Sequence, residues 1–291
     1  MTARRYILIS SCPDRSGVVA AVSGFIARHQ GCIVEADCHT DQETQRFFMR
    51  QEILADSLPL DLAEFQTQFS EVADEFNMDW RISDSARKKR AVILVSKQDH
   101  CLNDLLHRWR SGELHVDIPC VISNHEDLRG FVEWHGIPFH YVAVPNNNEQ
   151  EKAAAFEEIG GLFAQHLRRT GDTLVLARFM QIMPPHLCER YRGNLINIHH
   201  SFLPSFIGAK PYHQAHQRGV KLIGATCHYV TEHLDAGPII EQDTVRIAHS
   251  DSVDDLVRYG RDIERNVLAR ALRYHVEERV WIYGNKTVVF S

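Results

Sequence analysis

The sequence lacks the features that place a protein in a membrane or on nucleic acid. None of its apolar runs reaches the ~20 residues that a membrane-spanning helix needs. Lys and Arg number 32 against 38 Asp and Glu, and the net charge of −6 provides no basic field for nucleic acid or an acidic membrane. The apolar stretch after Arg4 and Arg5 stops at Ser10 and Pro13, so we expect no secretory signal.

Paired cysteines are missing as well. The seven cysteines are scattered, odd in number and never spaced as Cys-x-x-Cys, which argues against a disulfide framework or a thiolate zinc site. This pattern favours a reducing cytoplasm. The 18 histidines include no helical His-x-x-x-His pair with a nearby carboxylate, and a surface helix explains the closest pair, His213 and His216. We therefore predict that no metal is needed.

Residues 5–84 predict a compact βαββαβ unit. Strands are expected at 6–9, 32–40, 46–54 and 78–83, with helices at 18–29 and 58–76. Gly31 is the expected C-cap of the first helix. The basic run at 85–90 could be a nucleic-acid patch, but a solvated linker is favoured because the run is short and separates two periodic regions. The expected domains are therefore 1–84 and 91–291.

A new alternation begins at residue 91. Apolar strands are expected at 91–95, 118–122, 138–142, 173–177 and 195–199, with helices between them, the longest at 150–169. Buried strands that alternate with helices predict a Rossmann-like α/β domain, with a mostly parallel sheet covered on both faces. Such sheets bind ligands beyond the carboxyl ends of their strands. Longer strands, which an antiparallel arrangement would suit, are expected at 222–230 and 239–247, before a closing helix at 253–275.

The strand at 195–199 carries the residues best suited to catalysis. Asn197 and His199 are two positions apart, so on a strand both side chains point into the same cleft. Asp235 follows in the segment Leu-Asp-Ala-Gly-Pro. An amide donor, an imidazole and a carboxylate together make an active site plausible. His200 would point to the other face of the strand, and we assign it no role.

These motifs resemble a known family. The segment from Asn197 to Pro204, with Gly-Ala-Thr at 224–226 and Gly-Pro-Ile-Ile at 237–240, is similar to the folate-dependent formyltransferases, and the likeness extends from Arg90 onward. The front unit resembles an ACT domain, a ferredoxin-like βαββαβ module, through the segment at 11–18. The two together resemble the formyltetrahydrofolate deformylase family. That likeness implies hydrolysis of 10-formyltetrahydrofolate to formate and tetrahydrofolate, with formate supplied to purine biosynthesis.

The loop after the strand at 91–95 bears on the choice of acceptor. Relatives that act on a phosphorylated ribonucleotide have a small glycine-containing loop there, whose N–H groups face phosphate. Residues 95–102 contain no glycine, and Asp99 would repel phosphate. Water is therefore the favoured nucleophile. A formyltransferase with an unidentified amine acceptor and a non-catalytic folate-binding sensor are the alternatives, whereas an acidic chain disfavours a tRNA substrate.

The resemblance also implies residue roles. Asn197 and His199 would stabilise the tetrahedral oxyanion, while Asp235 would orient His199 and activate water. No cofactor is implied, because 10-formyltetrahydrofolate is the substrate. Lys210 would border the formyl site. The pterin pocket would be formed by Arg178, Phe179, Met180, Ile182, Val230, Thr231, Leu234 and Gly237.

The ACT-like unit leaves two interpretations open. As a sensor, it would bind an amino acid, with methionine or glycine expected from the family, near Asp14, Gly17, Val18 and Gly31. As a dimerisation module, it would pair its sheet with that of another copy. In both cases we expect a homo-oligomer assembled through this domain.

Overall fold

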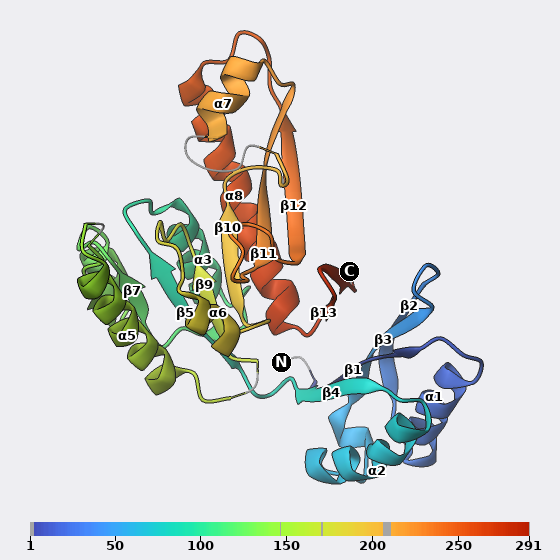
Figure 1. Ribbon diagram of the computed structural model, residues 1–291. Helices are drawn as coiled ribbons and strands as arrows, with labels where there is room; N and C mark the ends of the chain where they lie inside the picture. Colours follow the sequence, from blue (N-terminus) through green and yellow to red (C-terminus); the bar gives the residue numbers. More distant parts are fainter. Residues whose placement is uncertain (1–2, 146, 170, 206–210, 291) are drawn as a thin grey trace. The chain divides into compact units, whose positions relative to one another are not determined.

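The computed structural model describes residues 3–145, 147–169, 171–205 and 211–290. Backbone contacts divide it into two units, and Figure 1 shows the elements of each. The first unit runs to Lys88 and includes Glu277–Trp281 and the residues from Val288 onward, and the second consists of the rest. The boundary expected at 85–90 therefore lies between Lys88 and Lys89, and parts of the C-terminus belong to the first unit. Lys210 lies outside the described residues.

The first unit has the βαββαβ order expected of an ACT-like domain. Its four strands form an antiparallel sheet in the order β2-β3-β1-β4. The elements are β1 (Arg5–Pro13), α1 (Val18–Arg28), β2 (Ile33–Asp41), β3 (Arg46–Leu54), the 3₁₀ helix η1 (Ala55–Ser57), α2 (Leu62–Glu75) and β4 (Asp79–Asp84). A capping box between Asp61 and Glu64 begins α2. The side chains of Phe25, Phe65 and Phe69 pack together in the core.

The end of α1 differs from the expectation. Gln30, and not Gly31, takes the left-handed conformation, with φ 58°. The Gln30 N–H donates to the Ala27 carbonyl, and the Gly31 N–H donates to the Ile26 carbonyl. These two hydrogen bonds form a Schellman turn. The prediction that Gly31 is the C-cap is therefore wrong. Glycine is needed there for space, because a Cβ would lie 2.7 Å from the side chains of both Ile26 and Leu58.

Buried charge explains why C-terminal residues belong to the first unit. The Arg50 side chain, on β3, is 1% exposed. It contacts Glu52 and donates from Nε to the Glu278 carbonyl at 3.0 Å. Arg81 donates to the Glu278 carboxylate at 2.7 Å and to the Val280 carbonyl at 2.8 Å. A buried guanidinium needs such acceptors, and local sequence patterns do not reveal acceptors that are distant in the chain.

The second unit is built on an eight-stranded sheet in the order β12-β11-β10-β9-β5-β7-β8, with β6 paired to β5. Along this sheet, β8, β7, β5, β9 and β10 are parallel to their neighbours, as expected. Strand β11 is antiparallel to β10, and β12 is antiparallel to β11. Its strands are β5 (Lys89–Val95), β6 (Val116–Asp117), β7 (Val121–Ser123), β8 (Phe139–Tyr141), β9 (Thr173–Leu176), β10 (Leu195–His199), β11 (Leu222–Tyr229) and β12 (Ile239–Arg246). A C-terminal pair, β13 (Val280–Tyr283) and β14 (Lys286–Val289), was not predicted.

Helices cover both faces of this sheet. They are α3 (His100–Ser111), α4 (Arg129–Trp134), α5 (Glu149–His166), α6 (Pro185–Arg190), α7 (Pro211–Arg218) and α8 (Val253–Val276). Val92 and Leu94 of β5 pack with Phe156 and Phe163 of α5. Alternate strand residues face opposite sides, and on the other side α8 packs against α3 and β11. In the part of the chain that the structure describes, no helix is both long and apolar enough to cross a bilayer.

The contact between α7 and α8 predicts an unusual response to Gly260→Ala. A Cβ at Gly260 would lie 2.1 Å from the Tyr212 ring, so overpacking should lower the free energy of unfolding by roughly 1–3 kcal/mol, despite better helix propensity. The matched variant Gly161→Ala in α5 meets nothing within 4 Å and should gain about 0.5–1 kcal/mol. Urea unfolding measures both; equal stability of the two variants would contradict the packing of Tyr212 on α8.

Candidate active site

The three expected catalytic residues lie together at the carboxyl end of β10. Asn197 and His199 lie on β10, and its antiparallel register with β11 places His228 opposite Asn197. Asp235 lies in the loop between β11 and β12. His199 is only 5% exposed, so the charge on these groups is poorly screened by solvent.

Asp235 lies between two histidines. One carboxylate oxygen is 3.3 Å from His199 Nδ1 and the other is 3.7 Å from His228 Nε2. Burial acts to raise the pKa of Asp235, but the hydrogen bond and positive charge of His199, with His228 also nearby, outweigh it and hold that pKa well below its usual value. Asp235 is therefore ionised at neutral pH.

The other nitrogen of His199 is held by a serine that the sequence analysis gave no role. His199 Nε2 lies 2.8 Å from Ser201 Oγ, and Ser201 Oγ donates to the Ser205 carbonyl at 2.7 Å. A hydroxyl has one hydrogen, so Ser201 accepts from His199 and Nε2 carries a proton. The tautomer of His199 follows from this short chain of hydrogen bonds.

His228 is a site residue that sequence reasoning missed. Its Nδ1 is 2.9 Å from the Tyr229 carbonyl and therefore carries a proton, while its Nε2 is 3.3 Å from the Asn197 amide nitrogen. The sequence places His228 in an expected strand, but only the register between β10 and β11 reveals that it faces Asn197. Both strands are buried along most of their length, so no alternation of polar and apolar residues fixes that register.

The loop that carries Asp235 is folded tightly against the end of β11. Asp235 has a left-handed backbone, with φ 53°, a conformation that Asp tolerates better than most residues. A Cβ at Gly237 would lie 1.8 Å from the Tyr229 carbonyl oxygen, so only glycine fits. Gly237 therefore has a steric role in placing Asp235, and it is not among the residues that line the adjoining cavity.

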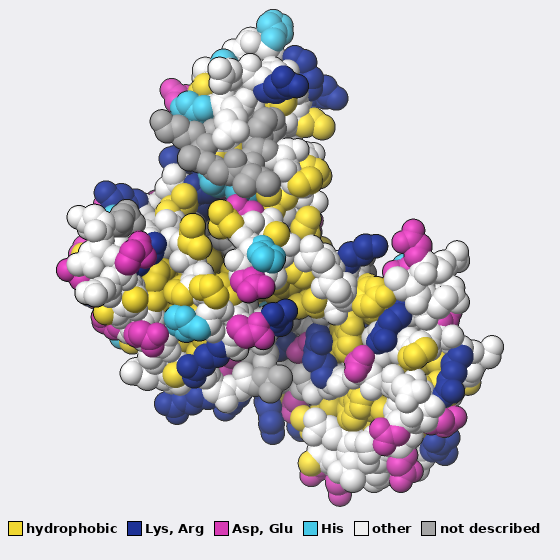
Figure 2. Space-filling model, in the orientation of Figure 1, with side chains coloured by type: hydrophobic (Ala, Val, Ile, Leu, Met, Phe, Trp, Pro, Cys, Tyr) yellow, Lys and Arg dark blue, Asp and Glu magenta, His cyan; other side chains and the backbone are white. Residues whose placement is uncertain are grey.

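A cavity of about 500 Å³ opens beside these residues. Asn197, His199 and Asp235 lie in its wall. The pocket residues expected from the sequence also line it, with the exception of Gly237: they are Arg178, Phe179, Met180, Ile182, Val230, Thr231 and Leu234. Exposed apolar side chains are visible on the face of this unit in Figure 2. Met180, Ile182 and Leu234 are all more than half exposed, which suits a flat, largely apolar ring system.

His200 is placed differently from the expectation. It lines this cavity and also a second one, of about 770 Å³, on the α7 side. Its ring centre is 5.2 Å from that of His199 and 6.2 Å from that of Tyr212. Burial, followed by the charge of Arg178, lowers the pKa of His200 to about 3. His200 is thus a neutral neighbour of the site, although it was expected to point to the other face of the strand.

The residues expected to bind an effector do not form one group within a single chain. Asp14, Gly17 and Val18 lie at the turn before α1, and Gly17 has a left-handed backbone with φ 97°. Gly31 follows the opposite end of that helix. Eleven helical residues span ~16 Å, so Gly31 is separated from the other three by the length of α1.

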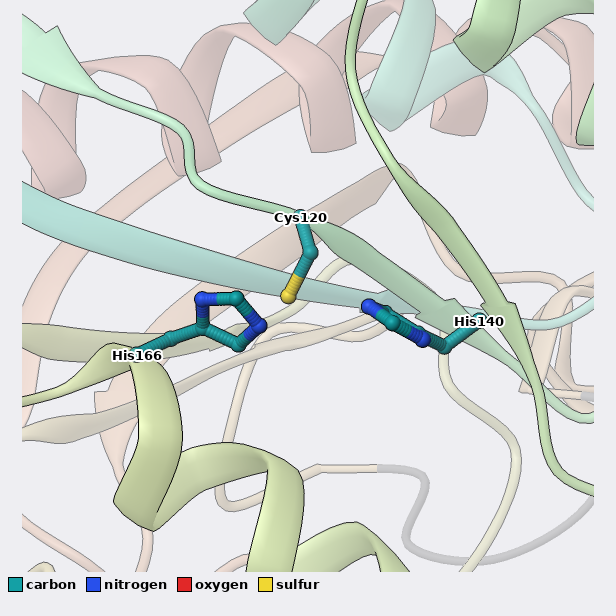
Figure 3. Close-up of side chains that lie close together, drawn as sticks. All are labelled: Cys120, His140 and His166. Atoms are coloured by element: carbon teal, nitrogen blue, oxygen red, sulfur yellow. The ribbon is translucent and has the colours of Figure 1, made fainter.

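Two groups of potential metal ligands occur among the described residues, and neither lines the cavity. Figure 3 shows one of them, in which Cys120 lies between His140 and His166. Burial raises the pKa of Cys120 to about 12, and Arg90 and Arg168 add positive charge near His166. A metal would have to displace a tightly held proton in a positive environment. The other group, His100, Cys101 and Glu264, adjoins the guanidinium of Arg178.

Comparison with known proteins assigns this site to a family. The formyl transferase family model matches residues 89–272. The formyltetrahydrofolate deformylase of Synechocystis sp. is 48% identical over 284 residues, which are 98% of each chain. The crystal structure of the same enzyme from Pseudomonas syringae pv. tomato has a TM-score of 0.96 at 58% identity, over 100% of this chain and 96% of that one. The chain belongs to the formyltetrahydrofolate deformylase family.

A more distant relative shares only part of the architecture. Glycinamide ribonucleotide transformylase 1 from Symbiobacterium toebii matches 70% of this chain and 95% of its own, with a TM-score of 0.62 and 28% identity. The deformylases, by contrast, match nearly all of this chain. About 30% of this chain therefore has no counterpart in that transformylase.

The position of His200 predicts a titration that can be observed. Its ring should stay neutral down to pH of about 3 in the folded protein, whereas an unfolded histidine titrates near 6.5. The folded-state pKa is the lower one, so the contribution of His200 to stability is complete above pH 6.5 and is lost as the pH falls toward 3. Histidine-labelled NMR measures this, with His200→Gln to assign the resonance and urea-unfolded protein as control. A folded-state midpoint between pH 5 and 7 would contradict the placement of His200 in the half-buried wall between the two cavities.

Proposed function

We propose that this protein hydrolyses 10-formyltetrahydrofolate to formate and tetrahydrofolate. Water adds to the formyl carbon, the bond from that carbon to N10 breaks, and N10 takes a proton. Membership of the deformylase family supports the reaction. Among the residues, the main support is the pair of His199 and Asp235. The Nδ1 atom of His199 is 3.3 Å from a carboxylate oxygen of Asp235, and both side chains line the cavity of about 500 Å³. The product formate would supply purine biosynthesis.

Asn197 supplies the fixed donor for the oxyanion. The neutral ring of His228 carries its hydrogen on Nδ1, because the backbone carbonyl of Tyr229 accepts that hydrogen. Its Nε2 therefore accepts one N–H of the Asn197 side-chain amide. The second N–H of that amide is left for the substrate oxygen. A preorganised donor of this kind stabilises a tetrahedral intermediate by about 3–4 kcal/mol.

His199 contributes positive charge. Its Nε2–H is committed to Ser201, and its Nδ1 faces an ionised carboxylate, so the imidazolium satisfies both neighbours. As negative charge develops on the formyl oxygen, the imidazolium is attracted to that charge. Its interaction with Asp235 becomes weaker as a result. The basicity of Asp235 then rises toward that of an ordinary carboxylate, which lets it accept the proton of the attacking water, directly or through a second water.

The pterin ring occupies the apolar part of the cavity. Phe179 forms its buried floor, Met180 and Leu234 its exposed rim, and the backbone of Arg178 and Ile182 offers groups for the polar ring edge. The side chain of Arg178 is 6% exposed and directed at Glu264 and Gln98. Its contribution to substrate binding is therefore made by the main chain.

Water is the acceptor because the loop after β5 has no built phosphate site among its described residues. The Ser96 hydroxyl donates to Asn124 at 2.7 Å and accepts from the Met180 N–H at 3.0 Å, so it is not available to a ligand. Asp99 adds negative charge at the start of α3. The alternative, a formyltransferase with an amine acceptor, would need its acceptor site elsewhere.

Removing each catalytic group predicts a distinct loss. Asn197→Ala should lower kcat roughly 10²–10³-fold with little change in KM, because its donor acts mainly on the oxyanion. Asp235→Asn keeps the shape but removes the charge that holds His199, and should be at least as damaging. Formate release from 10-formyltetrahydrofolate is the assay, with the exposed Asn266→Ala as control.

The same assay decides between the candidate functions. The wild-type protein should release formate with no acceptor added, and a chelator should leave the rate unchanged. No release without an amine acceptor would contradict hydrolysis in favour of transfer. Folate binding without turnover, unaffected by His199→Ala, would instead indicate a sensor.

The first unit serves assembly and regulation in this proposal. The protein is a homo-oligomer through its ACT-like sheet, works in the cytoplasm, and binds methionine or glycine at the turn of Asp14, Gly17 and Val18. Gly17→Val should abolish amino-acid binding, because its left-handed backbone strains any β-branched residue. Isothermal titration with each amino acid measures this, with Gly112→Ala, also of positive φ but part of the second unit, as control. Equal binding by both variants would contradict the assigned location.

A further inference from the structure

A buried carboxylate lies behind the cavity wall, and the proposed hydrolysis does not use it. Glu264 of α8 is 1% exposed. One oxygen is 2.8 Å from His100 Nε2 and 3.4 Å from Arg178 Nε, and the other accepts from the Tyr212 hydroxyl at 2.6 Å. Burying such a cluster costs more than packing apolar residues of the same volume, so stability alone does not account for it.

Arg178 connects Glu264 with the substrate cavity. Its side chain lies between Glu264 and Gln98, to which Nε donates at 3.0 Å. Its backbone is left-handed, with φ 64°, and its carbonyl accepts from the Ser96 N–H at 3.3 Å. Residues with this backbone need support from their surroundings. The cavity wall at 178–183 therefore begins at a residue whose conformation depends on Glu264.

Tyr212 connects the same carboxylate, through His200, with His199 of the proposed catalytic centre. Burial, followed by the negative charge of Glu264, raises the pKa of Tyr212, so its hydroxyl stays protonated and donates. Its ring lies against His200, which lies against His199. Glu264 thus contacts, through one neighbour each, the wall of the pterin pocket and the side of the catalytic centre.

The charge of Glu264 is what balances Arg178. Burial acts to raise the pKa of Glu264, but His100, Arg178 and Tyr212 outweigh it, so the carboxylate is ionised at neutral pH. Among the described residues, the Arg178 side chain has no other anionic partner. Without the charge of Glu264, a buried guanidinium would be left uncompensated and would be driven toward solvent.

We propose that Glu264 is a positioning residue for this site, which holds Arg178 and Tyr212 and thereby fixes the wall at 178–183 against which the folate binds. The proposal rests on the proposed function, since it names a determinant of folate binding at that site. Glu264 itself contacts no substrate. Its effect should appear chiefly in folate affinity, because Asn197, His199 and Asp235 are held by other contacts.

The test is Glu264→Gln, which preserves shape and removes the charge. We expect KM for 10-formyltetrahydrofolate and the Kd for tetrahydrofolate to rise together, by roughly 10-fold or more, while kcat falls less than about 5-fold. Glu264→Asp, which retains the charge, should recover part of the affinity. The matched control is Asp262→Asn, an exposed carboxylate on the same helix paired with Arg265, which should change neither constant.

A double-mutant cycle tests the pairing itself. Arg178→Gln combined with Glu264→Gln should raise Kd by less than the product of the two single effects, because removing both charges leaves neither uncompensated. Multiplicative effects, an unchanged Kd in Glu264→Gln, or a loss confined to kcat would each overturn the proposal. If Glu264→Gln fails to fold, Tyr212→Phe removes one of the contacts alone and should still raise Kd.

The two proposals can fail separately. Binding of tetrahydrofolate is measured by calorimetry and needs no turnover. A wild-type protein that binds tetrahydrofolate but releases no formate contradicts the hydrolase function, and the Kd of Glu264→Gln still tests the positioning role. A wild-type protein that releases formate, with a Glu264→Gln variant of unchanged Kd, contradicts the positioning role alone.

Discussion

The antiparallel pairing of β10 with β11 is the constraint on which the site depends. Because β11 is antiparallel, it ends beside the start of β10, where Tyr229 pairs with Ile196, and the loop that follows turns back toward His199. This pairing sets His228 opposite Asn197 and delivers the loop that bears Asp235. Gly237 then allows that loop to lie against the Tyr229 carbonyl. The catalytic groups thus come from elements that hydrogen bonding holds in one register.

Two buried ion pairs define the electrostatics around the cavity. His199 with Asp235 faces the substrate, and Arg178 with Glu264 lies behind the wall. Each cation has its own carboxylate, so neither pair leaves a net charge for the other to repel. His200 lies near both pairs and stays neutral because burial and Arg178 disfavour its protonation. In the proposed mechanism, this separation of charges in a region of low dielectric lets His199 respond to the oxyanion.

Local periodicity was sufficient for most elements, although not for β13 and β14, and for one face of the site. The two-residue repeat of a strand placed Asn197 beside His199, and helical spacing identified the buried faces of α1 and α2. Asp235 was picked out from its motif, whereas its role and most of the pocket came from resemblance. His228 and Glu264 were missed because strand register and helix packing join residues distant in sequence. Gly31 was misjudged for a related reason, since a residue from outside its helix, Leu58, determines the space available to it.

The contrast with transformylases bears on why water serves as acceptor. The transformylase shares this fold, with a TM-score of 0.62, and therefore has a similar sheet edge. The acceptor must then be determined by the residues that surround that edge. In this protein the Ser96 hydroxyl bonds to Asn124 and to the Met180 N–H, and so it supports the pterin wall and cannot bind a phosphate. The same loop also holds Arg178 through Gln98, so two of its polar side chains are engaged in supporting the pocket wall. The smallest nucleophile can then reach the formyl carbon without a binding site of its own.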